Sequence, residues 1–235
     1  MINSLIHPKK ESFSRYSHIR ISTLFFYEKL PQLNGFRKGK TPVALAVSQD
    51  FGSKKIKKVK ITDISQAKLN LGFYTPIVSQ DPRYAAMQVC NAVFGGGMTS
   101  KLFMNVREKE SLAYYALSSY SGHYGLVFVL AGIEAANEEK AYTLIQQQLT
   151  AMQQGDMTEL ELAQTKAMLT NQLKEALDSA RGQIEVYDQY KELDEQFSID
   201  TWAARWDRIT LDDVARMAKY VTLEKVYFLS GKEQE

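Results

Sequence analysis

The clearest signal along the chain is an alternation of apolar and polar positions in residues 67–74. Every second residue from Ala67 to Phe73 is apolar, and the residues between them are mostly polar or small. A period of two is typical of a β-strand with one buried face. The sequence therefore predicts a half-buried strand here, which ends before Pro76.

Two further runs, residues 112–120 and 126–133, are rich in residues that favour strands. The five residues between them, Ser121-Gly122-His123-Tyr124-Gly125, have the composition of a turn. Two such runs joined by a short loop that contains glycine predict a β-hairpin. The run from Lys225 to Ser230 predicts one more strand near the C-terminus.

Most of the other segments carry apolar residues at helical spacing. Asp81-Pro82 has the form of a helix start, with Asp as the N-cap and Pro in the first helical position. Asp200 is interpreted as the N-cap of a later short helix, and Thr158 with Glu161 has the spacing of a capping box. The predicted helices are about 82–94, 101–109, 137–154, 158–177, 182–195, a short one from 200, and 210–221.

The order of elements predicts the fold class. The chain runs from a strand through two helices to a hairpin, then through long and short helices to a final strand. A hairpin requires antiparallel pairing, and helices of this length need an apolar surface to cover. We therefore expect an α+β fold with a largely antiparallel sheet that is covered on one face by helices.

The net charge of +2 hides a division along the chain. Residues 1–70 contain 14 Lys and Arg but four Asp and Glu, whereas residues 71–235 contain 15 and 23. The segment 54–60 alone holds five lysines, which raises the hypothesis of a nucleic-acid contact through the phosphates. No aromatic stacking platform or arginine cluster accompanies the lysines, so a solvated strand or linker is the preferred interpretation.

The cysteine and histidine content excludes several classes of site. The one cysteine, Cys90, can form no disulfide within the chain and is interpreted as a small buried apolar residue. None of the three histidines lies in an H-E-x-x-H or H-x-x-E-H motif. No run approaches the ~20 apolar residues of a membrane span, and the first residues lack the apolar core of a signal peptide. We expect no membrane association and a reducing, cytoplasmic location.

The most distinctive stretch is residues 94–115, FGGGMTSKLFMNVREKESLAYY. Gly95, Gly96 and Gly97 allow positive φ and close approach, and they precede a helix N-terminus whose free N–H groups can bind an anion or a carbonyl oxygen. The spacing matches neither a P-loop nor a dinucleotide-binding loop. On spacing alone, a helix stop followed by a tight turn is the simpler interpretation.

Arg107 and Tyr114 follow the glycines and lie seven residues apart. Arginine offers a permanently charged set of donors, and tyrosine offers a neutral O–H donor. Two such donors can bind a substrate carbonyl or stabilise an oxyanion. The alternative is a surface arginine on a helix and a tyrosine on a sheet, and the spacing does not decide between them.

The same stretch resembles the signature of the C-terminal, inactive domain of the pitrilysin/insulinase family of zinc metallopeptidases. The matching elements are the small-residue loop, Ser100-Lys101-Leu102-Phe103, Arg107-Glu108-Lys109 and Leu112-Ala113-Tyr114. The resemblance extends over about residues 56–231 and is strongest with a bacterial, non-catalytic subunit. It implies the metallopeptidase-half fold, of the LuxS/mitochondrial-processing-peptidase-like type.

The resemblance also implies a function. In this family, two homologous halves enclose a chamber, and the zinc is bound by H-x-x-E-H of the other half. The zinc-free half supplies an arginine and a tyrosine that position the peptide substrate, and these match Arg107 and Tyr114. The glycine-rich loop, Gly95 to Gly97, is implicated in substrate handling. By this resemblance the chain carries no catalytic residue, no metal ligand and no cofactor of its own. Its expected partners are a zinc-bearing subunit or half and a peptide.

Three hypotheses follow for the whole chain. The leading one is a non-catalytic peptidase half, inactive alone, in residues 56–235, preceded by a basic segment, residues 1–55, that does not resemble the family. Such a chain would be the product of a truncated or split gene, or one subunit of a heterodimer. The second hypothesis is a peptide-binding or scaffold protein that adds a strand of peptide to its sheet. The third, a nucleic-acid-associated protein, ranks last.

Overall fold

The computed structural model describes residues 56–62, 64, 66–191, 193 and 197–231. The predicted basic segment 1–55 lies outside the described residues, so its separate character stays a prediction. The chain divides into two compact units. The larger unit spans 49–172 and 198–235, and the described part of the smaller unit is 173–191, 193 and 197.

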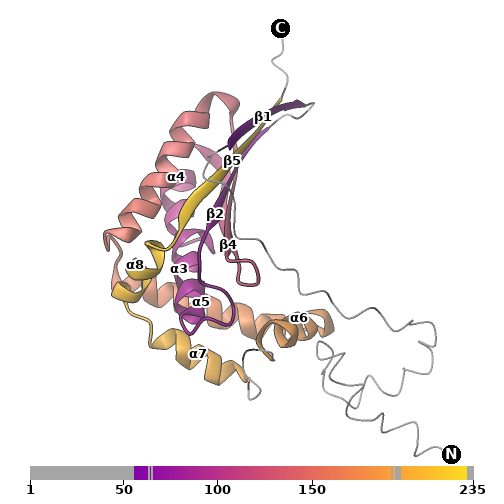
Figure 1. Ribbon diagram of the computed structural model, residues 1–235, viewed down its shortest axis with the longest axis vertical. Helices are drawn as coiled ribbons and strands as arrows, with labels where there is room; N and C mark the ends of the chain where they lie inside the picture. Colours follow the sequence, from indigo (N-terminus) through magenta and orange to yellow (C-terminus); the bar gives the residue numbers. More distant parts are fainter. Residues whose placement is uncertain (1–55, 63, 65, 192, 194–196, 232–235) are drawn as a thin grey trace, which may run out of the picture. The chain divides into compact units, whose positions relative to one another are not determined.

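The larger unit contains five strands and most of the helices (Figure 1). Its strands are β1 (Ile56–Thr62), β2 (Ala67–Tyr74), β3 (Ala113–Ser121), β4 (Leu126–Ile133) and β5 (Thr222–Gly231). Its helices are α3 (Tyr84–Gly95), η3 (Leu102–Lys109), η4 (Ala135–Asn137), α4 (Glu138–Gln153), most of α5 (Glu159–Ala176), α7 (Ile199–Asp207) and α8 (Leu211–Ala218).

The five strands form one sheet in the order β1-β5-β2-β4-β3. The predicted hairpin is present, because β3 and β4 pair antiparallel with Ser121 opposite Leu126. β2 pairs antiparallel with both β4 and β5, whereas β1 runs parallel to β5. The predicted α+β class with a largely antiparallel sheet is therefore confirmed, and the alternating strand at 67–74 lies at the sheet's centre.

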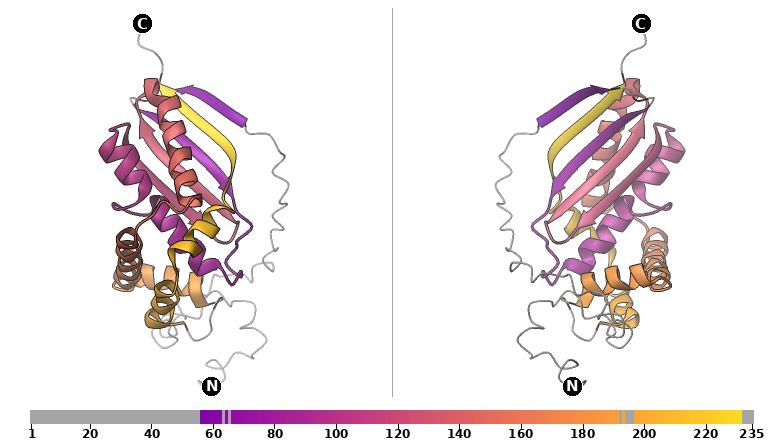
Figure 2. Two further views of the ribbon diagram at one scale, coloured as in Figure 1. Left: turned by 90° about the vertical axis from the view of Figure 1, so that its left-hand side faces the viewer. Right: turned by 90° about the vertical axis from the view of Figure 1, so that its right-hand side faces the viewer.

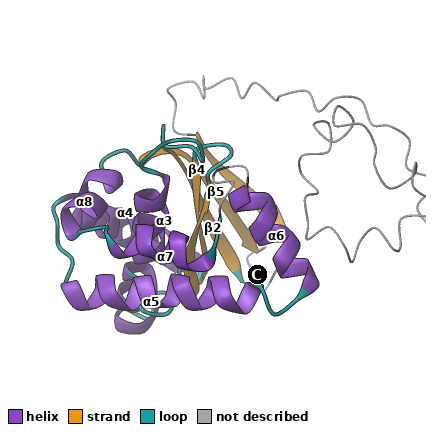
Figure 3. Ribbon diagram, turned by 90° about the horizontal axis from the view of Figure 1, so that it is seen from below, coloured by secondary structure: helices purple, strands orange, loops and turns teal. Residues whose placement is uncertain are grey.

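One face of the sheet carries α3, α4 and α8, as the end-on view in Figure 3 shows. The alternation of β2 places Leu69, Leu71 and Phe73 on this face, where each is at most 1% exposed. The ring of Phe73 meets the ring of Phe94 on α3 edge to face, with 6.2 Å between centroids. Burial of such side chains contributes about 1.5–3 kcal/mol each, so this layer holds the unit together.

The opposite face, called the open face below, is turned toward the viewer in Figure 2, right. Because successive side chains of a strand point to opposite faces, it carries the alternate side chains of the same strands. The register aligns Leu117 of β3, Leu130 of β4, Asn70 of β2 and Tyr227 of β5 in one row across it. Leu117, Phe128 and Leu130 are 40%, 42% and 38% exposed. These three side chains thus expose apolar surface beside Asn70 and Tyr227 on the open face.

Two predicted helix caps are wrong. α3 begins at Tyr84, because the Asp81 carboxylate accepts from the backbone and side chain of Arg83 and closes a separate turn before it. α7 is capped by Ser198, whose hydroxyl accepts from the Thr201 N–H, and Asp200 lies within the first turn. The Thr158–Glu161 capping box is confirmed, with the Thr158 N–H donating to the Glu161 carboxylate at 2.7 Å.

The smaller unit contains the end of α5 and helix α6 (Ala180–Lys191). The hydroxyl of Ser179 accepts from the Gly182 N–H at the start of α6. At its other end, the ring of Tyr190 stacks on Phe197 with 4.9 Å between centroids. These two contacts lie at the two ends of α6. The break that the sequence predicts near Gly182 lies at 177–179, between α5 and α6.

Candidate functional site

The segment that carries Arg107 is a π-helix rather than the predicted α-helix. Over η3 the backbone changes from the i→i−4 bond of Met104 to Ser100 to the i→i−5 bond of Glu110 to Asn105. π-helical turns are rare, and they occur frequently at functional sites. Leu102 and Val106 are buried against the sheet, which leaves the side chain of Arg107 half-exposed on the outer surface.

The turn from η3 into β3 is tight and carries an unusual backbone. Ser111 has a φ of +49°, and it is the one non-glycine residue with positive φ in the described part of the chain. The next N–H, of Leu112, donates to the carbonyl oxygen of Val106 at 3.0 Å. The chain therefore folds back onto the last turn of η3 before the strand begins.

Tyr114 occupies a bulge at the start of β3. Ala113 lies opposite Ile133 of β4, but Tyr115 lies opposite Gly132, so two steps on one strand match one step on the other. Tyr114 is the extra residue and is 60% exposed. A Cβ on Gly132 would lie only 2.3 Å from the ring of Tyr115, so this ring occupies the space over the glycine. A bulge of this kind redirects a side chain, and bulges are common beside active sites.

These features bring Arg107 and Tyr114 together. Both line one surface pocket of about 410 Å³ at the end of the hairpin, where β3 begins and β4 ends. The other residues that line it are Glu108, Ser111, Leu112, Ala113, Glu134 and Asn137. The pair that the sequence singled out thus shares one solvent-accessible recess at the edge of the sheet.

The guanidinium of Arg107 is held from two sides. Its Cζ lies 4.6 Å from the ring centroid of Phe103, and its Nε lies 3.7 Å from Oε1 of Glu108. Both contacts are exposed enough to be weak, because the side chains of Arg107 and Glu108 are 41% and 51% accessible. The guanidinium therefore has a preferred place in the pocket while its donors stay accessible to a ligand.

The three glycines do not line this pocket. Gly95 is buried where α3 approaches β3, and a Cβ there would lie 2.5 Å from the Ser118 nitrogen and 2.8 Å from the Leu102 side chain. The side chain of Met168 on α5 lies over Gly97. None of the three has positive φ, so close approach explains Gly95. Their substrate-handling role stays a prediction.

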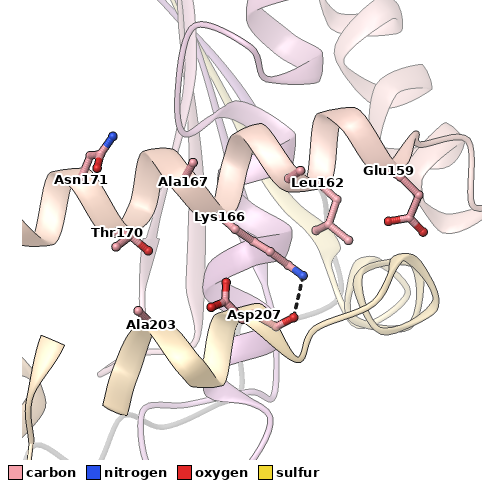
Figure 4. Close-up of a pocket in the computed structure, with 9 residues that line it drawn as sticks. Glu159, Leu162, Lys166, Ala167, Thr170, Asn171, Ala203 and Asp207 are labelled. Carbon is pink, nitrogen blue, oxygen red and sulfur yellow. Dashed lines mark hydrogen bonds between the residues drawn. The ribbon is translucent and has the colours of Figure 1, made fainter. Parts of the chain in front are cut away.

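A second pocket, between α5 and α7, has a different character (Figure 4). Small side chains, including Ala167 of α5 and Ala203 of α7, are among those that line it. The ammonium of Lys166 donates to the carbonyl oxygen of Asp207 at 2.9 Å, at the C-terminal end of α7. A cation at a helix C-terminus stabilises it. We interpret this pocket as a helix–helix contact.

The described residues offer no group of three or more His, Cys, Asp or Glu side chains that could hold a metal ion. The zinc of the peptidase family therefore has no fitting site in this part of the chain.

Burial raises the pKa of the Cys90 thiol to about 12, so this thiol is protonated at neutral pH. No described helix is long and apolar enough to cross a membrane.

The sequence alone did not identify Glu134, Asn137 and Ser111 as parts of the pocket. The hairpin register provides a usable signal for the first two. Because Ile133 pairs with Ala113, the residues after the end of β4 lie beside the residues before the start of β3. Ser111 has no comparable signal, because its φ depends on how η3 packs.

Comparison with known proteins agrees with this picture. Residues 26–169 match the family model "Peptidase M16 inactive domain", and this range includes part of the segment 1–55. The chain is 42% identical over 171 residues to "Probable inactive metalloprotease YmfF" of Bacillus subtilis. That match covers 73% of this chain and 40% of the relative. The chain thus spans well under half the length of this relative.

Two solved structures have a similar fold. A conserved protein from Enterococcus faecalis V583 is 39% identical with a TM-score of 0.72, over 78% of this chain and 44% of that one. A peptidase M16 inactive domain from Pseudomonas fluorescens is 23% identical with a TM-score of 0.64, over 77% and 44%. The match of the family model over more than half of the residues shows that the chain belongs to the peptidase M16 family, as its inactive domain.

Proposed function

We propose that this chain is the non-catalytic half of an insulinase-like zinc peptidase, and that it positions peptide substrate for a zinc-bearing half. The observation that carries the proposal is the shared pocket of Arg107 and Tyr114. The guanidinium and the phenol O–H are both hydrogen-bond donors. Two donors aimed at one carbonyl oxygen stabilise the negative charge that develops there during hydrolysis.

The open face supports the second part of the proposal, a wall of a substrate chamber. Leu117, Phe128 and Leu130 are exposed, whereas the alternate side chains Leu69, Leu71 and Phe73 of β2 are buried on the other face of the sheet. Exposed apolar patches on a protein surface commonly mark a binding surface. The pocket lies at one end of the same hairpin, so an extended peptide that crosses the open face can reach it.

The function is tested by reconstitution. The chain is mixed with a family member that carries H-x-x-E-H, and cleavage of a fluorogenic peptide is followed. We expect no cleavage by this chain alone and a rise in kcat/KM of the zinc-bearing chain that saturates at a one-to-one ratio. A zinc-bearing chain whose kcat/KM is unaffected by this chain contradicts the proposal.

The roles of the two residues are tested in the same assay. We expect Arg107→Ala to lower kcat/KM by about 100-fold, as the loss of one preorganised donor does elsewhere, and Tyr114→Phe to lower it by about tenfold. Matched controls are Arg208→Ala, an exposed arginine after α7, and Tyr124→Phe, which lies in the turn at the other end of the hairpin. If both pocket variants leave kcat and KM unchanged, the assigned roles are wrong.

A second candidate is a peptide-binding scaffold with no part in catalysis. The position of β3 at the edge of the sheet favours it, since an edge strand can pair with an added strand of peptide. Titration of extended peptides against the isolated chain separates the two functions. Binding that is as tight without the zinc-bearing half as with it, in a mixture that cleaves nothing, favours the scaffold.

A further inference from the structure

Three departures from regular backbone occur within fourteen residues of the chain. They are the π-helix η3, the positive φ of Ser111 and the bulge at Tyr114. An L-residue in the left-handed region is strained, and such conformations persist only where the surroundings over-determine them. All three departures lie at the pocket of Arg107 and Tyr114, which suggests that they serve its geometry.

Ser111 lies between the two donors, four residues after Arg107 and three before Tyr114, and it lines their pocket. The elements on either side are each also held by contacts beyond this turn. η3 is tied to α4 by the Asn105 side-chain amide, which donates to Gln148 at 2.6 Å. β3 is fixed by its ladder to β4. The φ of Ser111 therefore sets the direction in which the chain leaves the helix and enters the strand.

We propose that Ser111 is a positioning residue whose left-handed backbone sets the placement of Tyr114 relative to Arg107, so that both donate to the same peptide carbonyl. The inference rests on the proposed function and deepens it. Serine suits this task because its Cβ limits the φ and ψ angles that the backbone can adopt. Once the neighbouring elements place residue 111 in the left-handed region, the Cβ keeps the backbone within a narrow range there. Glycine adopts positive and negative φ about equally well, so it would fit the turn but not restrict it.

The test compares three substitutions in the full chain, reconstituted with the zinc-bearing half. We expect Ser111→Gly to leave the thermal unfolding midpoint unchanged while kcat/KM falls about tenfold, because small misplacement of positioning groups is costly. Ser111→Asn, which tolerates positive φ, keeps kcat/KM within about twofold. Ser111→Ala keeps the Cβ and removes the hydroxyl, and it also stays within about twofold of the unsubstituted chain.

A double-mutant cycle measures the coupling between Arg107 and Tyr114. A loss of stability alone at Ser111 would leave this coupling unchanged. In the unsubstituted chain, the losses from Arg107→Ala and Tyr114→Phe are expected to deviate from independence by about fivefold, because the two donors share one oxygen. In the Ser111→Gly background this deviation should fall within about twofold.

Two outcomes overturn the inference while leaving the proposed function intact. The first is a Ser111→Gly chain with unaltered kcat/KM and unaltered coupling, in an assay where Arg107→Ala is impaired. The second is a loss from Ser111→Ala as large as the loss from Ser111→Gly, which would assign the role to the hydroxyl. If Arg107→Ala itself has no effect, the proposed function and this inference both fall.

Discussion

The helical layer around α7 and the junction between η3 and β3 belong to the same unit, but they are built in opposite ways. The first buries Trp202 and Trp206, each 2% exposed, and both indole N–H groups donate to Oε1 of Gln88 at 3.1 Å. The second presents Arg107 and Tyr114 to solvent on an irregular backbone. Stability is concentrated where side chains are buried and satisfied, and potential function where donors remain accessible.

The largest expected difference between the two regions is in the free energy of unfolding. Trp206→Ala should lower it by about 3–5 kcal/mol, because it removes a fully buried aromatic side chain and leaves a cavity. Tyr114→Ala, at a side chain that is 60% exposed, should lower it by less than about 1 kcal/mol. Urea denaturation of both variants measures the contrast, and equal losses would show that the junction is also part of the stabilising core.

A smaller effect is expected from loss of the two hydrogen bonds that the indoles of Trp202 and Trp206 donate to Gln88. Gln88→Met keeps the approximate volume but leaves two indole N–H groups without their acceptor, which should cost about 2 kcal/mol. The control is Gln147→Met on α4, whose side chain is exposed and should be within about 0.5 kcal/mol of the unsubstituted chain. Equal values for the two variants would mean that water replaces the lost acceptor without loss.

The smallest expected effect concerns the ion pair between Lys101, which precedes η3, and Glu161 of α5. Lys101 Nζ lies 2.8 Å from Glu161 Oε1. Burial raises the pKa of Glu161, but the hydrogen bonds from Lys101 and the Thr158 N–H outweigh it, so the net pKa is below the ordinary value near 4.5. The ionised carboxylate therefore stabilises the fold at pH above that value, and this stabilisation is lost as the pH falls through the lowered pKa.

Glu161→Gln tests this linkage. The difference in unfolding midpoint between the unsubstituted chain and the variant should be constant near neutral pH and should close as the pH falls below about 4.5, through the lowered pKa of Glu161. Asp212→Asn, at an exposed carboxylate in the first turn of α8, serves as the control for general acid effects. A gap that stays unchanged over the whole acidic range would show that the ionisation of Glu161 adds nothing to the fold.

Much of the fold follows from the sequence because its signals are periodic. The alternation in β2, the hairpin of β3 and β4, and the capping box of Thr158 and Glu161 each leave a local pattern that the structure confirms. Asp81 and Asp200 were misread because an acidic residue near a helix start is compatible with several turn geometries. The true cap of α7, Ser198, lies two residues before Asp200.

The geometry of the site follows less directly. The i→i−5 bonding of η3 and the extra residue at Tyr114 have no periodic signature, because each arises when a helix or strand adjusts to its neighbours. Gly95 is required by its contact with Ser118, 23 residues further along the chain, which no local pattern reveals. The sequence singles out Arg107 and Tyr114 of the residues that line the pocket, whereas their orientation depends on the assembled sheet.

The proposed function places Tyr114 at the substrate in the assembled peptidase. The most direct test replaces Tyr114 with the photoreactive p-benzoylphenylalanine and adds peptide together with a zinc-bearing half whose water-activating glutamate is changed to glutamine. We predict that light cross-links the peptide to position 114, and that the same replacement at Tyr124 gives little cross-linking. Cross-linking at position 124 that equals or exceeds that at position 114 would contradict the claim.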